Sequence, residues 1–251
     1  MLWYKSWLET RWRFLIGLAL LLCSAAGAVF TYPQVLKLLP LVPANAGGVL
    51  GERIRESADL ARTYRGFVWS NWYHQNLSQM GTLFAILLGS AGIVSPSSGI
   101  VFTLSLPISR RRLLGIRAAS GLAQLFALVV IPSLLIPLLA PAIGQSYSVG
   151  STLVHSACLF IGVSIFFTLA FLLSTAFSDP WPPLLIALAF AFALALIDQV
   201  LREPVLSLYA VMRAETYFRS GHLPWGGLLA SSALSASMFY AAAANFARRD
   251  F

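Results

Sequence analysis

Charged side chains are scarce in this chain. Asp, Glu, Lys and Arg make up 10% of the 251 residues, whereas hydrophobic residues make up 58% and the mean hydropathy is +0.78. A soluble domain carries about a quarter charged residues. Polar turns would also interrupt a soluble core, but here the apolar runs approach the length of a helix that crosses a bilayer. The composition therefore predicts an all-α integral membrane protein.

Residues and motifs for catalysis are equally scarce. The three histidines include no pair at a metal-binding spacing, and the two cysteines, Cys23 and Cys158, lie in apolar runs where a thiol packs as a small hydrophobe. The chain has neither a G-x-x-x-x-G-K-[ST] phosphate-binding loop nor a G-x-S-x-G nucleophile motif. We therefore expect no catalytic, metal or cofactor site on this chain. An intramembrane hydrolase is disfavoured because its convergent polar groups are missing from the spans.

The net charge of +8 is placed around the apolar runs rather than within one basic domain. Basic residues in such positions set the topology of the helices and contact anionic lipid headgroups. Membrane lipid is therefore the expected partner of these charges, and nucleic acid is not. Asp198 and His155 lie near predicted span ends, where we expect each to be interfacial or internally hydrogen-bonded.

Apolar runs separated by Pro, Gly, Ser or charge clusters predict six transmembrane helices. The spans are expected at residues 14–30, 77–102, 118–139, 153–176, 184–200 and 226–246, with external loops at 33–76 and 201–225. Two further short helices are predicted beside them. Trp3–Phe14 has an aromatic and a polar flank, which favours either an interfacial elbow helix or an ordinary aromatic belt. Leu50–Tyr64 fits an external amphipathic helix or a solvated loop.

Arginines and lysines near the span ends favour a cytoplasmic N-terminus, and an even number of spans then places both termini in the cytoplasm. The basic residues on the cytoplasmic side would be Lys5, Arg11, Arg13, Arg110, Arg111, Arg112, Arg117, Arg248 and Arg249. A similar number would be external, but in long loops where acidic residues are interleaved with them. This asymmetry sets the predicted orientation.

The connection between the second and third spans has an unusual sequence, FTLSLPISRRRLLGIRAASG. It resembles the L-S-x-P-x-S-R-R-x segment that follows the second span in permease subunits of type-2 ATP-binding-cassette (ABC) exporters. The segment WSNWYHQNLSQ, Trp69–Gln79, is similar to the aromatic and amide-rich start of the second span in some of these permeases. The resemblance covers about thirty residues in motif and the whole chain in architecture.

The resemblance implies a half-transporter in a bacterial cytoplasmic (inner) membrane. Two permease subunits would pair, as a homodimer or a heterodimer, and each would dock on a separate cytoplasmic ABC ATPase subunit that holds ATP and Mg²⁺. The docking element would be a cytoplasmic coupling helix between spans 2 and 3. Its residues would be Leu104, Ser105, Leu106, Pro107, Ile108, Ser109, Arg110, Arg111 and Arg112.

Two functions therefore compete. The first is a permease that moves an amphipathic substrate across the membrane with ATP hydrolysed by the separate subunit. Nearly uncharged spans leave more room for such a molecule than for a small ion. The alternative is a non-transporting scaffold or assembly factor that recruits a cytoplasmic partner through the same arginines.

The predicted topology can be tested by labelling single cysteines in sealed cells. Six spans and the positions of the arginines place Ser109 and Phe251 in the cytoplasm and Ser57 and Ser220 outside. An impermeant thiol reagent should label cysteines at Ser57 and Ser220 only, in a background without Cys23 and Cys158. Labelling of a cysteine at Ser109 together with protection of a cysteine at Ser57 would show that the topology is inverted.

Overall fold

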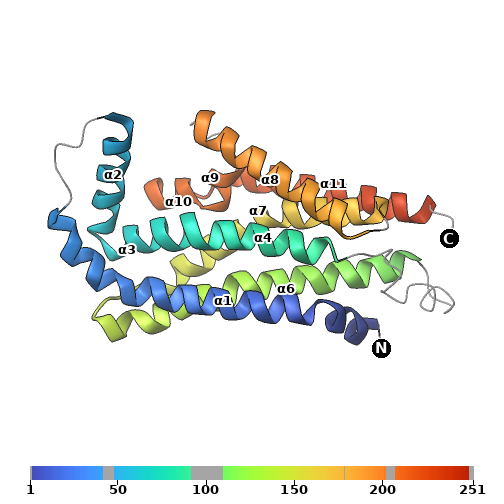
Figure 1. Cartoon of the computed structure of the whole chain (residues 1–251), viewed down its shortest axis with the longest axis horizontal. Coiled ribbons are helices and arrows are strands. Elements are labelled where there is room, and N and C mark those ends of the chain that lie inside the picture. The colour runs from blue at the N-terminus through green and yellow to red at the C-terminus, as the bar shows by residue number, and fades with distance from the viewer. Residues whose placement is uncertain (1, 42–47, 92–109, 178, 202–206, 249–251) are drawn as a thin grey trace.

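The chain, seen in a computed structural model that describes residues 2–41, 48–91, 110–177, 179–201 and 207–248, is all helical within those ranges. The longer elements lie along a common axis and form an elongated bundle (Figure 1). They are α1 (Leu2–Leu38), α4 (Ser78–Gly89), α6 (Arg110–Leu139), α7 (Val149–Ala176), α8 (Trp181–Leu201) and α11 (Trp225–Arg248). The shorter ones are η1 (Leu39–Leu41), α2 (Gly48–Ala61), α3 (Tyr64–Phe67), η2 (Val68–Leu77), η4 (Ala140–Ile143), α9 (Leu208–Met212) and α10 (Glu215–Ser220).

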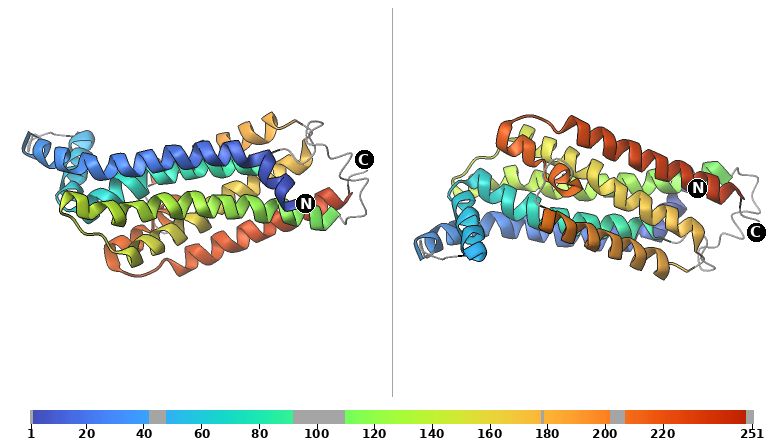
Figure 2. Two further views of the ribbon diagram at one scale, coloured as in Figure 1. Left: turned by 90° about the horizontal axis from the view of Figure 1, so that it is seen from below. Right: turned by 90° about the horizontal axis from the view of Figure 1, so that it is seen from above.

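The two ends of the bundle differ in what they hold. Both termini, the start of α6 and the end of α4 lie at one end, which we call the terminal end (Figures 1 and 2). The other end, which we call the distal end, holds α2 and α10 (Figure 1). Between the ends, α7 is the central helix, because it packs against α4, α6, α8, α9 and α11.

The apolar side chains on the surface and the polar ones inside are distributed as in a membrane-embedded protein. Large apolar side chains point outward along several helices, for example Phe30 on α1, Phe192 on α8 and Leu229 on α11, each more than half exposed. Polar side chains such as Gln124 and Ser133 are buried. An apolar surface of this extent is a liability in water but is the surface that lipid tails cover. Five helices, α1, α6, α7, α8 and α11, are long and apolar enough to cross a membrane.

Several hydroxyl groups inside the helices are satisfied locally. Thr82, Ser133, Ser164 and Thr168 each donate a hydrogen bond to the carbonyl oxygen four residues earlier, over 2.7–2.9 Å. These bonds keep the hydroxyls paired where no bulk water reaches. Local bonding does not reach every buried hydroxyl, because Ser156 and Ser235 have no hydrogen-bond partner among the described residues.

The segment from α3 through η2 to α4 is helical without a break from Tyr64 to Gly89. Its middle part, η2, is π-helical and buries Trp69, Trp72 and Tyr73. The Trp72 indole nitrogen donates a hydrogen bond of 3.2 Å to the Ser133 hydroxyl on α6. Most of the region predicted as an external loop, residues 33–76, is thus helical, because its aromatic residues pack into the bundle instead of facing water.

The observed helix bounds differ from the predicted spans mainly at the polar flanks. Hydropathy detects only the apolar stretch, whereas backbone hydrogen bonding continues through neighbouring polar turns. The first span, predicted at 14–30, lies within α1, which runs from Leu2 to Leu38. The second span, predicted at 77–102, overlaps a continuous helix that begins thirteen residues earlier, at Tyr64, and ends at Gly89. Residues 92–102 lie outside the described ranges.

The two predicted short helices are both helical. Residues of the predicted elbow, Trp3–Phe14, form the start of α1, which bends there toward the N-terminus (Figure 2, left). Trp3, Trp7 and Trp12 are exposed, whereas Phe14 at the end of the segment is buried, as are Ser6 and Thr10. The second predicted helix is α2, which crosses the distal end at a steep angle to the bundle axis (Figure 1). An interfacial position of either helix stays a prediction.

Helix α9 is inserted into the bundle between α7 and α11, and two glycines make room for it. A Cβ atom at Gly162 of α7 would lie 2.1 Å from Met212 Cγ, and one at Gly227 of α11 would lie 2.4 Å from Val211 Cγ2. The predicted external loop 201–225 therefore contains a segment that is buried in the described structure, since Tyr209, Val211 and Met212 are all buried.

Filling the first of these glycine positions should dislodge α9. Gly162→Val overpacks the contact with Met212 and should cost about 1–3 kcal/mol, measured as a lower midpoint of thermal unfolding in detergent. Gly27→Ala is the control, because no atom lies within 4 Å of a Cβ at that position of α1. Its midpoint should stay or rise, since Ala is favoured over Gly in a helix by about 1 kcal/mol. Equal midpoints for the two variants would show that the close contact between Gly162 and Met212 does not hold α9 in place.

Candidate functional site

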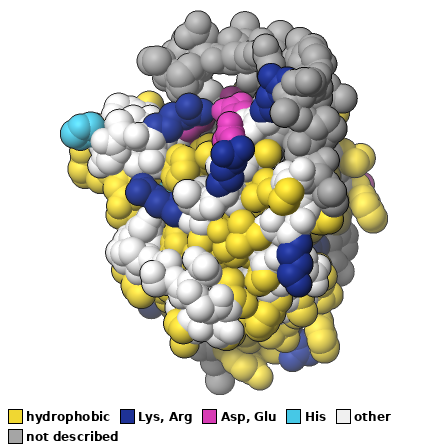
Figure 3. All heavy atoms as spheres, turned by 90° about the vertical axis from the view of Figure 1, so that its left-hand side faces the viewer, with side chains coloured by type: hydrophobic (Ala, Val, Ile, Leu, Met, Phe, Trp, Pro, Cys, Tyr) yellow, Lys and Arg dark blue, Asp and Glu magenta, His cyan; other side chains and the backbone are white. Residues whose placement is uncertain are grey.

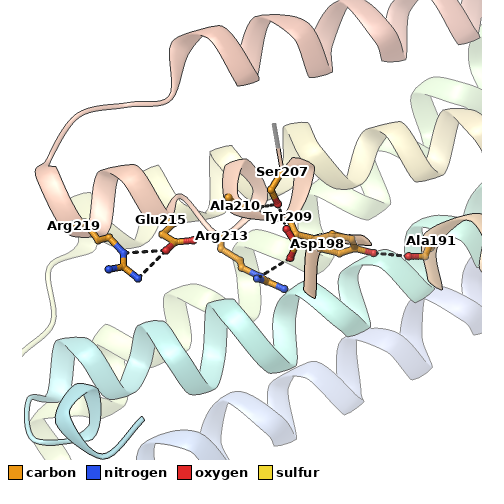
Figure 4. Close-up of polar contacts among 8 residues, drawn as sticks. All are labelled: Ala191, Asp198, Ser207, Tyr209, Ala210, Arg213, Glu215 and Arg219. Atoms are coloured by element: carbon orange, nitrogen blue, oxygen red, sulfur yellow. Dashed lines mark hydrogen bonds and ion pairs between the residues drawn. The ribbon is translucent and has the colours of Figure 1, made fainter. Parts of the chain in front are cut away.

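A group of polar side chains joins α8, the segment of α9 and η2. Ser207, the N-cap of α9, accepts a hydrogen bond from the Ala210 amide over 3.0 Å and donates one to Asp198 Oδ1 (Figure 4). Arg213, which follows α9, places Nη1 3.4 Å from Asp198 Oδ2. We call Asp198, Ser207, Tyr209 and Arg213 the distal polar layer.

The distal polar layer joins three helical segments. Tyr209 donates a hydrogen bond of 3.0 Å to the Ala191 carbonyl oxygen of α8, and its ring lies under the Arg213 guanidinium at 5.4 Å (Figure 4). The Trp69 indole nitrogen of η2 donates to the Arg213 carbonyl oxygen over 3.0 Å. Each contact requires α9 to stay inserted, so the layer fixes the position of this short helix.

Burial controls the electrostatics of the layer. The side chains of Asp198 and Arg213 are 17% and 19% exposed. Burial lowers the pKa of the Arg213 guanidinium, and the carboxylates of Asp198 and Glu215 oppose that change. A guanidinium remains charged under either influence. The ion pair of Asp198 and Arg213 therefore lies partly buried at the rim of the apolar bundle.

A groove of about 630 Å³ lies beside the layer, between α2, η2 and α10. Its polar lining includes Trp69, Asn71, His74 and Arg219, and the volume is in the range of small-molecule sites. Arg219 pairs with Glu215 at 2.9 Å and with Glu56 at 3.6 Å, and its side chain is 61% exposed. These groups can orient a polar ligand, but the exposed ion pairs contribute little to stability.

A second polar cluster ties the helices together toward the terminal end. Arg13 donates from Nη1 to the Leu87 carbonyl oxygen over 2.6 Å, linking α1 to α4. Gln124 of α6 donates to the Thr10 hydroxyl over 2.7 Å, and Arg117 of α6 pairs with Glu9. These contacts hold the start of α1 against α4 and against the first half of α6, the helix that begins with the three consecutive arginines.

The predicted coupling residues are only partly described. Leu104 to Ser109 lie outside the described ranges, and Arg110, Arg111 and Arg112 form the first residues of α6. Arg112 is exposed. Helix α9, which carries part of the distal polar layer, lies away from the start of α6 along the bundle (Figure 1).

Two sequence-based expectations about single residues are confirmed. Asp198 is internally bonded, to Ser207 and Arg213, and His155 Nδ1 lies 2.8 Å from the Ser151 carbonyl oxygen, one turn earlier. The sequence did not reveal the partner of Asp198. The only indication of this partner in the sequence is that Arg213, a basic residue, lies in the polar connection that follows Asp198 at the end of a span.

The resemblance segment Trp69–Gln79 has an unusual conformation, since its first nine residues belong to the π-helical η2. π-Helical turns are rare and frequently mark functional sites. Groups of three or more His, Cys, Asp or Glu that could hold a metal ion are absent from the part of the chain that is described. No protein-family model, curated protein or solved structure matches the chain.

Neutralising Asp198 should destabilise the distal end. Asp198→Asn leaves the Arg213 guanidinium without its counter-charge in a site that is less than one-fifth exposed. We expect a loss of about 1–3 kcal/mol, read as a lower thermal midpoint in detergent. Arg219→Gln is the matched control, because an exposed ion pair contributes at most about 1 kcal/mol. Equal effects of both variants would argue against the importance of the buried pair.

Proposed function

We propose that the chain is the permease subunit of an ABC transporter, and that it moves an amphipathic molecule across the membrane. The observation that carries the proposal is the position of the resemblance segment. The arginines that close it, Arg110–Arg112, begin α6 at the same end of the bundle as both termini (Figure 1). A single cytoplasmic partner at this end could contact Arg110–Arg112, the start of α1 and the end of α11.

The proposal includes six membrane crossings. Five helices meet the length and apolarity of a span, and the sixth crossing is the continuous helix α3–η2–α4, Tyr64 to Gly89. At a rise of about 1.5 Å per residue this segment approaches 40 Å, enough to cross a hydrocarbon core of about 30 Å. Six crossings put both termini on one side, in agreement with the positive-inside assignment.

Force from the ATPase would enter at the start of α6. Helix α6 packs against α1 and α7, and α7 packs against α9 and α11. A displacement of the docking segment therefore reaches the distal polar layer through two packed helices. ATP and Mg²⁺ would bind to the ATPase subunit, and a second permease copy would complete the pathway. Rocking of the bundle would alternate access between the two ends.

The docking segment can be tested in cells that express the chain with its ATPase partner. Leu106→Asp puts an unpaired charge into an apolar contact and should reduce copurified ATPase and transport by more than about tenfold, as a cost of 2–5 kcal/mol implies. The amount of permease in the membrane should not change. Leu106→Ile is the control and should behave as the wild type.

The outcomes separate the two functions. If Leu106→Asp loses the ATPase partner and the wild type supports ATP-dependent transport, the permease function is supported. Partner binding that needs Leu106 but never supports transport by any reconstituted pair would favour the scaffold. Full partner binding and transport by Leu106→Asp would remove the docking role from this segment.

A further inference from the structure

A second cavity, of about 510 Å³, lies at the distal end beside the first turn of α7. We call it the α7 cavity. It is lined by Arg65 of α3, by Ser146, Tyr147 and Ser148 before α7, by Ser151 in the first turn of α7, and by Tyr217 of α10. Its lining differs from that of the larger groove, because Arg65 is the charged residue and no described carboxylate takes part. The cavity is therefore electropositive.

Arg65 is positioned to bind an anion. Its side chain is exposed and pairs with no described carboxylate; its contacts are one weak hydrogen bond of 3.4 Å to the Phe218 carbonyl oxygen and the Phe218 ring at 5.4 Å. The guanidinium has five N–H donors, so most of them stay available. Figure 3 shows basic side chains spread over the distal end, with the visible acidic ones gathered in one place near the top.

A buried hydroxyl at the cavity lacks an acceptor. The Tyr147 hydroxyl is shielded from solvent and has no described hydrogen-bond partner. Tyr147, Ser151 and Arg65 all line the cavity. Burial raises the pKa of Tyr147, and the Ser151 hydroxyl and the Arg65 guanidinium oppose that rise. The hydroxyl is therefore a protonated donor that lacks an acceptor, and an anion oxygen would satisfy it.

The start of α7 adds positive potential. This helix has 28 residues, and the side chain of its N-cap, Ser148, accepts a hydrogen bond from the Ser151 amide. The other first-turn amides lack intrahelical acceptors, and the helix dipole favours negative charge at this point. The dipole supports Arg65 and Tyr147 but would not define a site without them.

We propose that the α7 cavity binds a phosphate group or a similar oxyanion, with Arg65 as its charged ligand and the hydroxyls of Tyr147 and Ser151 as further donors. The anion is either the headgroup of an anionic lipid or a free phosphate compound, since both present the same oxygens. This site is separate from the docking segment, so its test needs no ATPase and does not depend on the permease proposal.

The test uses the full-length chain purified in an uncharged maltoside detergent. Inorganic phosphate and dihexanoyl phosphatidylglycerol are titrated separately by calorimetry. Arg65→Gln should weaken binding by about tenfold or more, because a charge-assisted contact is lost. Tyr147→Phe should weaken it about three- to tenfold through the loss of one hydroxyl donor. The phenylalanine keeps the ring, so folding is preserved.

Two matched controls sharpen the test. Arg62→Gln removes an exposed arginine three residues earlier that already pairs with Asp59 at 3.3 Å, and Tyr64→Phe removes a buried hydroxyl that does not line the cavity. Both should bind as the wild type does. Binding of phosphate identifies a soluble source, and binding of the lipid without phosphate identifies a headgroup. Binding of neither probe, or equal losses for Arg65→Gln and Arg62→Gln, overturns the proposal.

Discussion

The absence of water from the hydrocarbon core is the constraint on which this structure depends. A polar group without a partner there costs several kcal/mol, which favours pairing within the protein. Thr82 and Thr168 meet the constraint within their own helices. Asp198 cannot, because a carboxylate needs donors that its own helix does not offer. Its partners, Ser207 and Arg213, come from the segment that is folded back into the bundle.

This requirement explains the design of the distal end. Helix α9 is only five residues long and could not be stable by itself. It is held by a serine cap, by close approach to Gly162 and Gly227, and by hydrogen bonds from Tyr209 and Trp69. The same polar contacts bring Arg213 close to the bundle. Both distal cavities border the neighbouring α10.

Much of the fold could be predicted from the sequence, because hydropathy measures the property that lipid selects. The apolar runs at 118–139, 153–176 and 226–246 all lie within observed helices. Residues 64–76 were assigned to a loop because their amides, His74 and Arg65 lower the local hydropathy. The structure makes them helical, since Trp69, Trp72 and Tyr73 gain buried contacts that a one-dimensional average does not register.

The sequence by itself determined that the chain is helical, that lipid is its solvent, and that Asp198 and His155 lie near span ends, where each would be interfacial or internally hydrogen-bonded. These conclusions rest on local composition and on the cost of an unpaired polar group. Only the tertiary structure decided that Arg213 pairs with Asp198, that α9 inserts between α7 and α11, and that Arg65 and Tyr147 border one cavity. Such pairings join residues from separate elements, and their geometry depends on how whole helices pack.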